Sequence, residues 1–147
     1  MNPTWTVRVG RTPNGIASVR TKAHGLEIGQ ALDFGAKASA PSALETFLGA
    51  LGADLLLRFT DRCARARLPI DQIEARVDGT LGNALVALGV VGEEGEPGLA
   101  VATVVLTVAS PSPETELRAV WDDVLARSPL VATLTRATNL TCEMRLL

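Results

Sequence analysis

The sequence predicts an α+β fold, and three features of its hydrophobic pattern lead to that prediction. Apolar and polar side chains alternate in segments near both ends of the chain, which is typical of strands. A long, mostly apolar stretch in the middle carries the boundary signals of a helix. Strands and helices do not alternate as parallel βαβ units would require. We therefore expect antiparallel sheets packed around a long central helix, in the order β-β-β-α-β-β-α-α-β.

The first third of the chain is predicted to form an antiparallel meander. The segment TWTVRV alternates, and the turn residues Pro13, Asn14 and Gly15 follow it. Two more strand-like segments come next, separated by a short connection. A loop of mostly small residues, 34–42, then leads into the helix. The predicted strands span residues 4–9, 16–22 and 24–29.

The central helix is predicted to begin after a capping box and to end near Arg67. Ser42 and Glu45 form the S-x-x-E pattern, in which each side chain accepts a hydrogen bond from the backbone N–H of the other residue. Pro69 disfavours helical geometry at the residue before it, which sets the end of the helix.

Two glycines lie inside this predicted helix. Gly49 and Gly52 each cost the helix about 1 kcal/mol relative to alanine. We expect that something offsets this cost, and close approach of another backbone is the usual reason for a helical glycine.

The second half of the chain supplies the remaining strands and two more helices. A helix is predicted over residues 110–128, with Ser112 as its cap and Pro113 in its first turn. A short helix is predicted over residues 128–136. Residues 82–98 fit a strand, a short helix or a loop. The predicted strands span residues 70–81, 99–108 and 140–147.

The composition fits one globular domain, residues 1–147. The chain has 147 residues, of which 47% are hydrophobic and 20% charged, so it can bury a core and does not resemble a disordered protein. The net charge is −2. Since proteins that bind nucleic acids usually carry a basic excess, we expect no nucleic-acid partner.

We expect no membrane span, metal site or cofactor. The N-terminus lacks a charged region followed by an apolar one, so it does not resemble a signal peptide. The longest apolar runs reach about ten residues, whereas a bilayer needs roughly 20. The two cysteines lie far apart without C-x-x-C spacing, and His24 is the single histidine. A soluble, cytoplasmic protein is the expectation.

Two segments resemble the OsmC/Ohr family of proteins. Residues 24–54, HGLEIGQALDFGAKASAPSALETFLGALGAD, resemble the stretch that leads into the central helix of that family. Residues 126–144, ARSPLVATLTRATNLTCEM, resemble its second signature, which comprises a helix end, Cys-Pro-Val, a short helix and a last strand. The predicted element order also matches, and the resemblance extends from about residue 4 to residue 147.

The resemblance implies an intertwined homodimer and a peroxidase activity. OsmC/Ohr proteins reduce organic hydroperoxides in the response to oxidative stress. One cysteine of the central helix attacks the peroxide, a second cysteine resolves the sulfenic acid as a disulfide, and an Arg and a Glu assist. A nearby guanidinium favours the thiolate, and the second thiol prevents further oxidation of the first.

This chain departs from the family at both cysteines. Matched residue by residue, the attacking cysteine falls on Asp54 and the resolving cysteine on Ser128. Neither residue can carry out the thiol reaction. Glu45 matches the family's Glu, Arg11 is the nearest match to its Arg, and Arg20 is a second candidate.

The two remaining cysteines are expected to pack rather than react. Cys63 follows Asp54 by nine residues, which at about 100° per residue places it on the opposite side of the helix. Cys142 falls on the apolar face of the last predicted strand. Free cysteine is among the most buried residue types.

Asp54 has three interpretations. It can belong to a solvated stripe with Arg58, Asp61 and Arg65, since these residues follow at helical spacing. It can instead form a salt bridge with an Arg that fills the former catalytic pocket, which is the hypothesis we favour. A working acid or base is the third possibility.

The other candidates also have structural explanations. Ser128 before Pro129 is a helix N-cap. The capping box explains Glu45 without catalysis, and His24 fits a surface or core position. Residues 82–98 lack the G-x-G-x-x-G pattern of a nucleotide site, and the family resemblance makes them a candidate rim of a ligand pocket.

Three functional hypotheses follow from these patterns. The first is a homodimer that binds a small hydrophobic ligand at the subunit interface, or has a purely structural role, without thiol peroxidase activity. The second is an enzyme that uses Asp54 and an Arg as acid and base on another substrate. The third is residual peroxide reduction through Cys63. The pocket candidates are Asp54, Arg58, Glu45, Ser128, Arg11 and Arg20.

Overall fold

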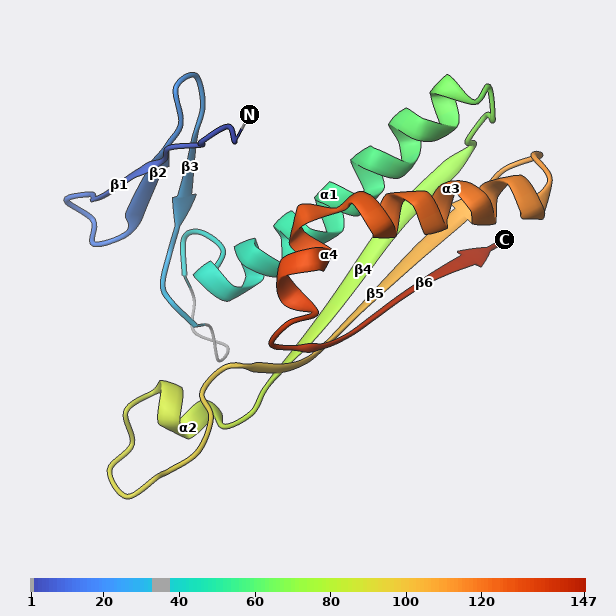
Figure 1. Ribbon diagram of the computed structural model, residues 1–147. Coiled ribbons are helices and arrows are strands. Elements are labelled where there is room, and N and C mark those ends of the chain that lie inside the picture. The colour runs from blue at the N-terminus through green and yellow to red at the C-terminus, as the bar shows by residue number, and fades with distance from the viewer. Residues whose placement is uncertain (1, 33–37) are drawn as a thin grey trace. The chain divides into compact units, whose positions relative to one another are not determined.

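The computed structural model describes residues 2–32 and 38–147, and these divide into two compact units. The first unit is Met1–Phe47 and the second is Leu48–Leu147. The element order confirms the predicted α+β fold and adds one short helix, α2, within the ambiguous region (Figure 1). Part of the predicted loop 34–42 lies outside the described residues. That the whole chain forms a single domain stays a prediction.

The first unit contains a small antiparallel sheet. Its strands are β1 (Arg8–Arg11), β2 (Ala17–Arg20) and β3 (Gly25–Ile28), in the order β1-β2-β3. The predicted turn connects the first two strands, with Gly15 at a φ of 82° that suits glycine. The first strand was predicted from residue 4, but its pairing with β2 begins only at Arg8. Alternation of apolar and polar residues does not show where a neighbouring strand is present to pair with.

The helix α1 (Ala43–Arg65) begins with the predicted capping box. The backbone N–H of Ser42 donates to Glu45 Oε2 at 2.8 Å, and the N–H of Glu45 donates to Ser42 Oγ at 3.1 Å. The helix ends at Arg65, two residues before the predicted end. There the N–H of Leu68 turns back to the carbonyl of Cys63 at 2.9 Å.

The sheet of the second unit is mixed, which corrects the expectation of purely antiparallel sheets. Its strands are β4 (Gln72–Leu81), β5 (Leu99–Ala109) and β6 (Asn139–Leu146). The pair β4–β5 is antiparallel, but β5–β6 is parallel. The chain returns to the same end of the sheet through α3 (Glu114–Arg127) and α4 (Pro129–Leu134), and such a crossover makes the next strand parallel.

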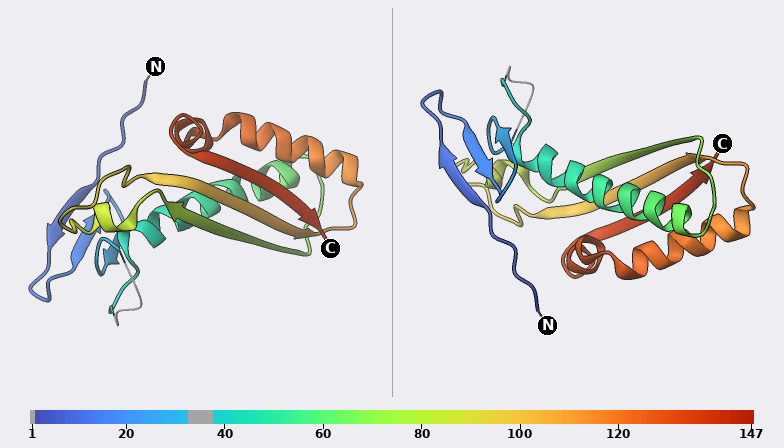
Figure 2. Two further views of the ribbon diagram at one scale, coloured as in Figure 1. Left: turned by 90° about the horizontal axis from the view of Figure 1, so that it is seen from below. Right: turned by 90° about the horizontal axis from the view of Figure 1, so that it is seen from above.

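The core of the second unit lies between this sheet and the helices α1 and α3 (Figure 2). Phe59 of α1 meets Trp121 of α3 edge to face, with ring centroids 6.2 Å apart. The buried residues of the core are Leu51, Leu55, Phe59, Cys63, Leu68, Val104, Leu106, Val108, Leu117, Trp121, Val124 and Met144.

The two helical glycines differ in their surroundings. A Cβ atom on Gly52 would lie 2.9 Å from Val77 Cγ2, so a side chain of β4, and not the backbone that was expected, approaches this glycine closely. A Cβ atom on Gly49 would meet nothing within 4 Å among the described residues. The expectation of a close neighbour stays a prediction for Gly49.

Ser112 does not cap α3, which corrects a second prediction. The N-cap is Pro113, which has no side-chain capping bond, and its carbonyl accepts from the N–H groups of Glu116 and Leu117. The hydroxyl of Ser110 instead accepts from the N–H of Ser112 at 3.1 Å. The S-x-x-E spacing that marked the first helix is absent here, so the sequence offered a weaker signal.

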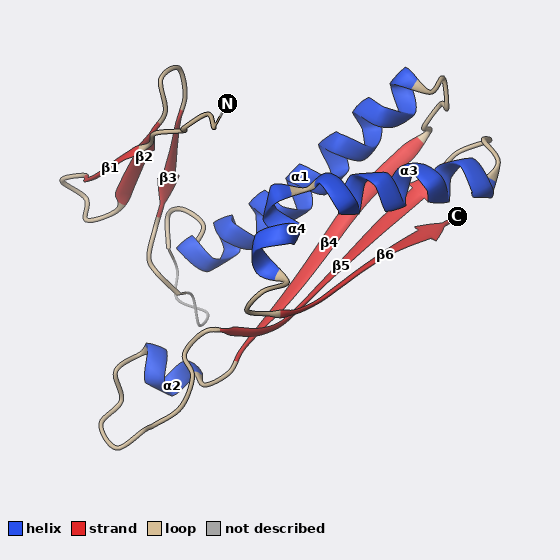
Figure 3. Cartoon of the chain, viewed as in Figure 1, coloured by secondary structure: helices blue, strands red, loops and turns tan. Residues whose placement is uncertain are grey.

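The ambiguous segment between β4 and β5 contains α2 (Ala84–Ala87) and a loop (Figure 3). Asn83 caps α2, since its side-chain oxygen accepts from the N–H of Leu85 at 2.9 Å. The base of the segment closes through Gly82 N–H to the carbonyl of Gly98 at 2.9 Å. Among the described residues, no helix is both long and apolar enough to cross a membrane.

Candidate functional site

Asp54 and Ser128, the two residues that the family resemblance matches to cysteines, contact each other directly. Asp54 lies on α1, and Ser128 lies between α3 and α4. The Ser128 hydroxyl donates to Asp54 Oδ2 at 2.6 Å. Ser128 is 1% exposed and the Asp54 side chain 17%. The fold therefore brings together two positions that are 74 residues apart in the sequence.

Ser128 also caps α4, as predicted. Its Oγ accepts a hydrogen bond from the backbone N–H of Val131 at 3.1 Å, and Pro129 occupies the first turn. A hydroxyl can donate once and accept as well, so one atom serves both the cap and the carboxylate. The cap position thus fixes the orientation in which Ser128 meets Asp54.

Arg58 completes the polar cluster around Asp54. Its Nε donates to Asp54 Oδ1 at 2.7 Å, four residues along the same helix. Asp61 and Arg65 form a separate, more exposed pair at 3.0 Å. Asp54 is therefore not simply the first member of a solvated stripe, because one carboxylate oxygen faces the helix partner and the other faces a buried hydroxyl.

These contacts limit the chemistry that Asp54 can perform. Both carboxylate oxygens already accept hydrogen bonds, one from a guanidinium and one from a hydroxyl. Bonds to a charged acceptor are among the stronger hydrogen bonds in proteins. A substrate that needed this carboxylate as a base would have to displace Ser128 or Arg58 first.

A neighbouring ionic network on α1 and α3 was missed by the sequence reasoning. Asp123 accepts from Arg127 at 2.6 Å and pairs with Arg62 at 2.7 Å. The hydrogen bond from Arg127, opposed by partial desolvation and helped by the charge of Arg62, lowers the pKa of Asp123. The spacing of Asp123 and Arg127, four residues on one helix, was a signal in the sequence.

Two shallow hollows lie between these helices. The larger, of about 430 Å³, is lined by residues that include Arg62, Ala119 and Asp123. The smaller, of about 80 Å³, includes Arg58 and Arg127 in its lining and shares Arg62 and Asp123 with the first. Arg62 of α1 and Asp123 of α3 line both hollows and pair with each other. We therefore assign these two residues a role in joining α1 to α3.

Glu45, Arg11 and Arg20 belong to the first unit, whereas Asp54, Arg58 and Ser128 belong to the second. Glu45 serves the capping box, and the two bonds that it shares with Ser42 lower its pKa. That Glu45, Arg11 or Arg20 shares a pocket with Asp54 stays a prediction. The same holds for residues 82–98 as the rim of that pocket.

The capping box predicts a dependence of stability on pH. The pKa of Glu45 is lowered from its ordinary value of 4.5 in the folded state, mainly by the backbone N–H of Ser42. Its stabilising contribution is therefore complete above that value and is lost as pH falls through the lowered folded value. We expect Glu45→Gln to be less stable than the unmodified protein at pH 7 and equally stable near pH 2. Urea unfolding at several pH values measures this, and an unchanged difference between the two proteins at both pH values would contradict it.

Neither cysteine is arranged for thiol chemistry. Cys63 is fully buried in the core, where desolvation raises its pKa to about 11, and it lies away from Asp54 as the helix arithmetic predicted. Cys142 is half-buried on β6, and desolvation raises its pKa as well. Within residues 2–32 and 38–147, no group of three or more His, Cys, Asp or Glu side chains could hold a metal ion.

Comparison with known proteins points to one fold. No protein-family model matches the sequence, and no curated protein matches it. An OsmC-like protein from Mycoplasma pneumoniae aligns with a TM-score of 0.79 at 18% identity, over 100% of this chain and 99% of that one. An OsmC-like protein of unknown function from Vibrio cholerae gives 0.73 at 11% identity, over 97% and 99%. The organic hydroperoxide resistance protein OhrB of Bacillus subtilis gives 0.60 at 13% identity, over 97% and 98%. The chain has the fold of OsmC-like and Ohr proteins, along its whole length.

Proposed function

We propose that this protein, whose fold is that of OsmC-like and Ohr proteins, is a member of the OsmC/Ohr family that lacks thiol peroxidase activity. It is a cytoplasmic homodimer that binds a small hydrophobic ligand at the subunit interface. The observation that carries the proposal is the 2.6 Å hydrogen bond between Ser128 and Asp54. A resolving thiol must reach the attacking thiol, and the two residues matched to that pair do reach each other.

The chemistry of these two residues supports the loss of peroxidase activity. Peroxide reduction by this route needs a thiolate that attacks oxygen and a second thiol that forms a disulfide. Asp54 and Ser128 carry oxygen in both places. Cys63 cannot replace them readily, because burial raises its pKa to about 11 and little thiolate exists at neutral pH.

Turnover of an alkyl hydroperoxide with a dithiol reductant tests this proposal. We expect the purified protein to consume peroxide at the rate of the reductant alone, and Cys63→Ala to behave identically. Robust turnover that disappears in Cys63→Ala would overturn the proposal and favour the residual peroxidase. Turnover that persists in Cys63→Ala but disappears in Asp54→Asn would favour acid–base chemistry.

The homodimer is supported by an exposed stripe on α1. Gly49, Ala50, Ala53 and Leu57 follow at helical spacing, and all four are exposed in the single chain, Leu57 to 64%. The cost of Gly49, about 1 kcal/mol relative to alanine, is not offset by any neighbour among the described residues. Close packing of a second α1 on this stripe would offset it and cover Leu57.

Substitutions in the stripe test the dimer. Leu57→Glu should convert a dimer into a monomer in analytical ultracentrifugation, since a buried unpaired carboxylate costs several kcal/mol. Val91→Glu is the matched control, because Val91 is 98% exposed and lies outside α1. Gly49→Ala should also weaken the dimer. Equal masses for all four proteins would contradict the proposed interface.

The ligand is tested with an apolar dye such as Nile red. We expect dye fluorescence to rise with the dimeric protein and to fall to background in the monomeric Leu57→Glu variant, because the proposed pocket needs both subunits. Equal dye binding by monomer and dimer would place any ligand site elsewhere.

A further inference from the structure

We propose that one face of the sheet β1-β2-β3 is a binding site for a phosphate-type oxyanion, held between Arg8 and Arg20. The site lies entirely within the first unit and goes beyond the proposed function. The register of the strands, the open space above Gly10 and the absence of carboxylate partners of Arg8 and Arg20 among the described residues all point to this site.

The register places two like charges directly opposite each other. Arg8 pairs with Arg20 across β1 and β2, and Gly10 pairs with Ser18. Because side chains alternate along a strand, these four residues share one face of the sheet. Like charges directly opposite destabilise a strand pair, by roughly as much as a favourable pair stabilises it. An anion between the two guanidiniums removes that repulsion.

The same face is hollowed. An open hollow of about 550 Å³ is lined by residues that include Arg8, Gly10, Ser18, Arg20 and Glu27. A Cβ atom on Gly10 would meet nothing within 4 Å among the described residues, so the glycine leaves space above the strand. A glycine inside a strand weakens the strand and often marks close approach of a ligand. The volume lies in the range of small-molecule sites, about 300–1,000 Å³.

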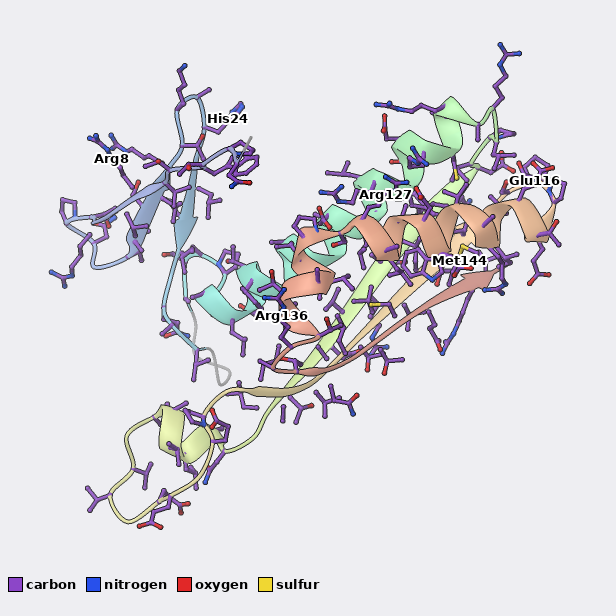
Figure 4. The ribbon with its side chains drawn as sticks, viewed as in Figure 1. Arg8, His24, Glu116, Arg127, Arg136 and Met144 are labelled. Atoms are coloured by element: carbon purple, nitrogen blue, oxygen red, sulfur yellow. The ribbon has the colours of Figure 1, made fainter. Side chains whose placement is uncertain are left out.

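The arginines of this face differ from most arginines of the second unit. Seven of the nine arginines there each pair with an Asp or Glu among the described residues, and Arg67 and Arg136 do not; the seven are Arg58, Arg62, Arg65, Arg76, Arg118, Arg127 and Arg145. Within the described residues, neither Arg8 nor Arg20 forms such a pair. Both are exposed, and Arg8 stands on the sheet in Figure 4. Since the whole chain has a net charge of −2, this is a local feature and not a general basic surface.

The chemistry of the site favours a dianion. Guanidinium forks bind phosphate oxygens in pairs, and the Ser18 hydroxyl can donate to a further oxygen. The residues lining the hollow include three arginines, Arg8, Arg11 and Arg20, and the carboxylate of Glu27, a net charge of +2 that a doubly charged phosphate group neutralises. The same group is present in soluble phosphate compounds and, with one or two charges, in phospholipid headgroups.

Calorimetric titration of the full chain with inorganic pyrophosphate tests the site. We expect binding that Arg8→Gln and Arg20→Gln each weaken about tenfold or more, as the loss of a charge-assisted bidentate contact does. Gly10→Val should weaken it similarly by filling the hollow without changing charge. Lys22→Gln is the matched control, because it removes one exposed cation of the same unit outside the hollow, and its effect should stay below twofold. Circular dichroism checks that each variant is folded.

The outcomes distinguish a specific anion-binding site from nonspecific electrostatic attraction. Equal weakening by Lys22→Gln and Arg20→Gln, or unchanged binding in Gly10→Val, would overturn the proposal, and so would no detectable pyrophosphate binding. A parallel titration with phosphatidylglycerol vesicles identifies the source of the ligand. Vesicle binding that pyrophosphate displaces and Arg20→Gln abolishes supports a lipid headgroup, whereas pyrophosphate binding without vesicle binding supports a soluble ligand.

Discussion

Replacing Ser128 with alanine is expected to lower the free energy of unfolding by about 2–3 kcal/mol. Loss of a helix N-cap costs roughly 0.5–2 kcal/mol, and loss of a hydrogen bond to a charged group roughly 1.5–3 kcal/mol. The two losses are not additive, since water can reach the Asp54 side chain, which is 17% exposed. Urea unfolding measures the change. Thr135→Ala, which removes an exposed hydroxyl of the same region, should cost less than about 0.5 kcal/mol.

A double-mutant cycle separates the two roles of Ser128. Asp54→Ala and Ser128→Ala should show a coupling energy of about 1 kcal/mol or more, because each substitution removes the same 2.6 Å hydrogen bond. The N-cap contribution belongs to Ser128 alone and cancels in the cycle. Additive effects of the two substitutions would mean that this hydrogen bond contributes nothing measurable to stability.

Introducing cysteine at positions 54 and 128 together should create peroxidase activity at least tenfold above the unmodified protein. The side chains at these positions reach each other, which a disulfide requires. A thiolate at position 54 would attack the peroxide, release the alcohol and become a sulfenic acid. The thiol at position 128 would then form the disulfide with loss of water, and the dithiol reductant would restore both thiols. Arg58, now paired with Asp54, would favour the thiolate.

Single substitutions provide the controls for this experiment. Asp54→Cys alone should turn over more slowly than the double variant and lose activity with time, since its sulfenic acid is reduced only by the added dithiol and is otherwise oxidised further. Ser128→Cys alone should stay at background. The initial rate of hydroperoxide loss and the mass of the oxidised protein measure both effects. If the double variant forms the disulfide but consumes no peroxide, the substrate does not reach position 54, and the similarity to OsmC-like and Ohr proteins is limited to the fold.

The structural features that were predicted correctly depend on residues that are close together in the sequence. The capping box of Ser42 and Glu45 needs two residues three positions apart, and both of its hydrogen bonds are present. The burial of Cys63 away from Asp54 follows from the rotation of one helix. The Ser128 cap needs only the short segment that it begins.

The predictions that failed needed partners distant in the sequence. The parallel pairing of β5 with β6 depends on where α3 and α4 return the chain, which alternation along one strand cannot report. Ser112 has the right residue type for a cap, but Pro113 occupies the cap position. For the candidate site, the structure brings Asp54, Arg58 and Ser128 together, and their role in a functional site stays a prediction. Arg62 and Asp123 were overlooked because their contact crosses two helices.

Residue chemistry and spacing were enough to establish the α+β order, the start of α1 and the absence of sulfur from positions 54 and 128, because each is a local property of the chain. The tertiary structure determines which hydrogen bonds the side-chain oxygens of Asp54 and Ser128 form. Residues 74 positions apart share a hydrogen bond only when the sheet and the crossover helices bring α1 to the start of α4, and packing of nonlocal elements sets that distance.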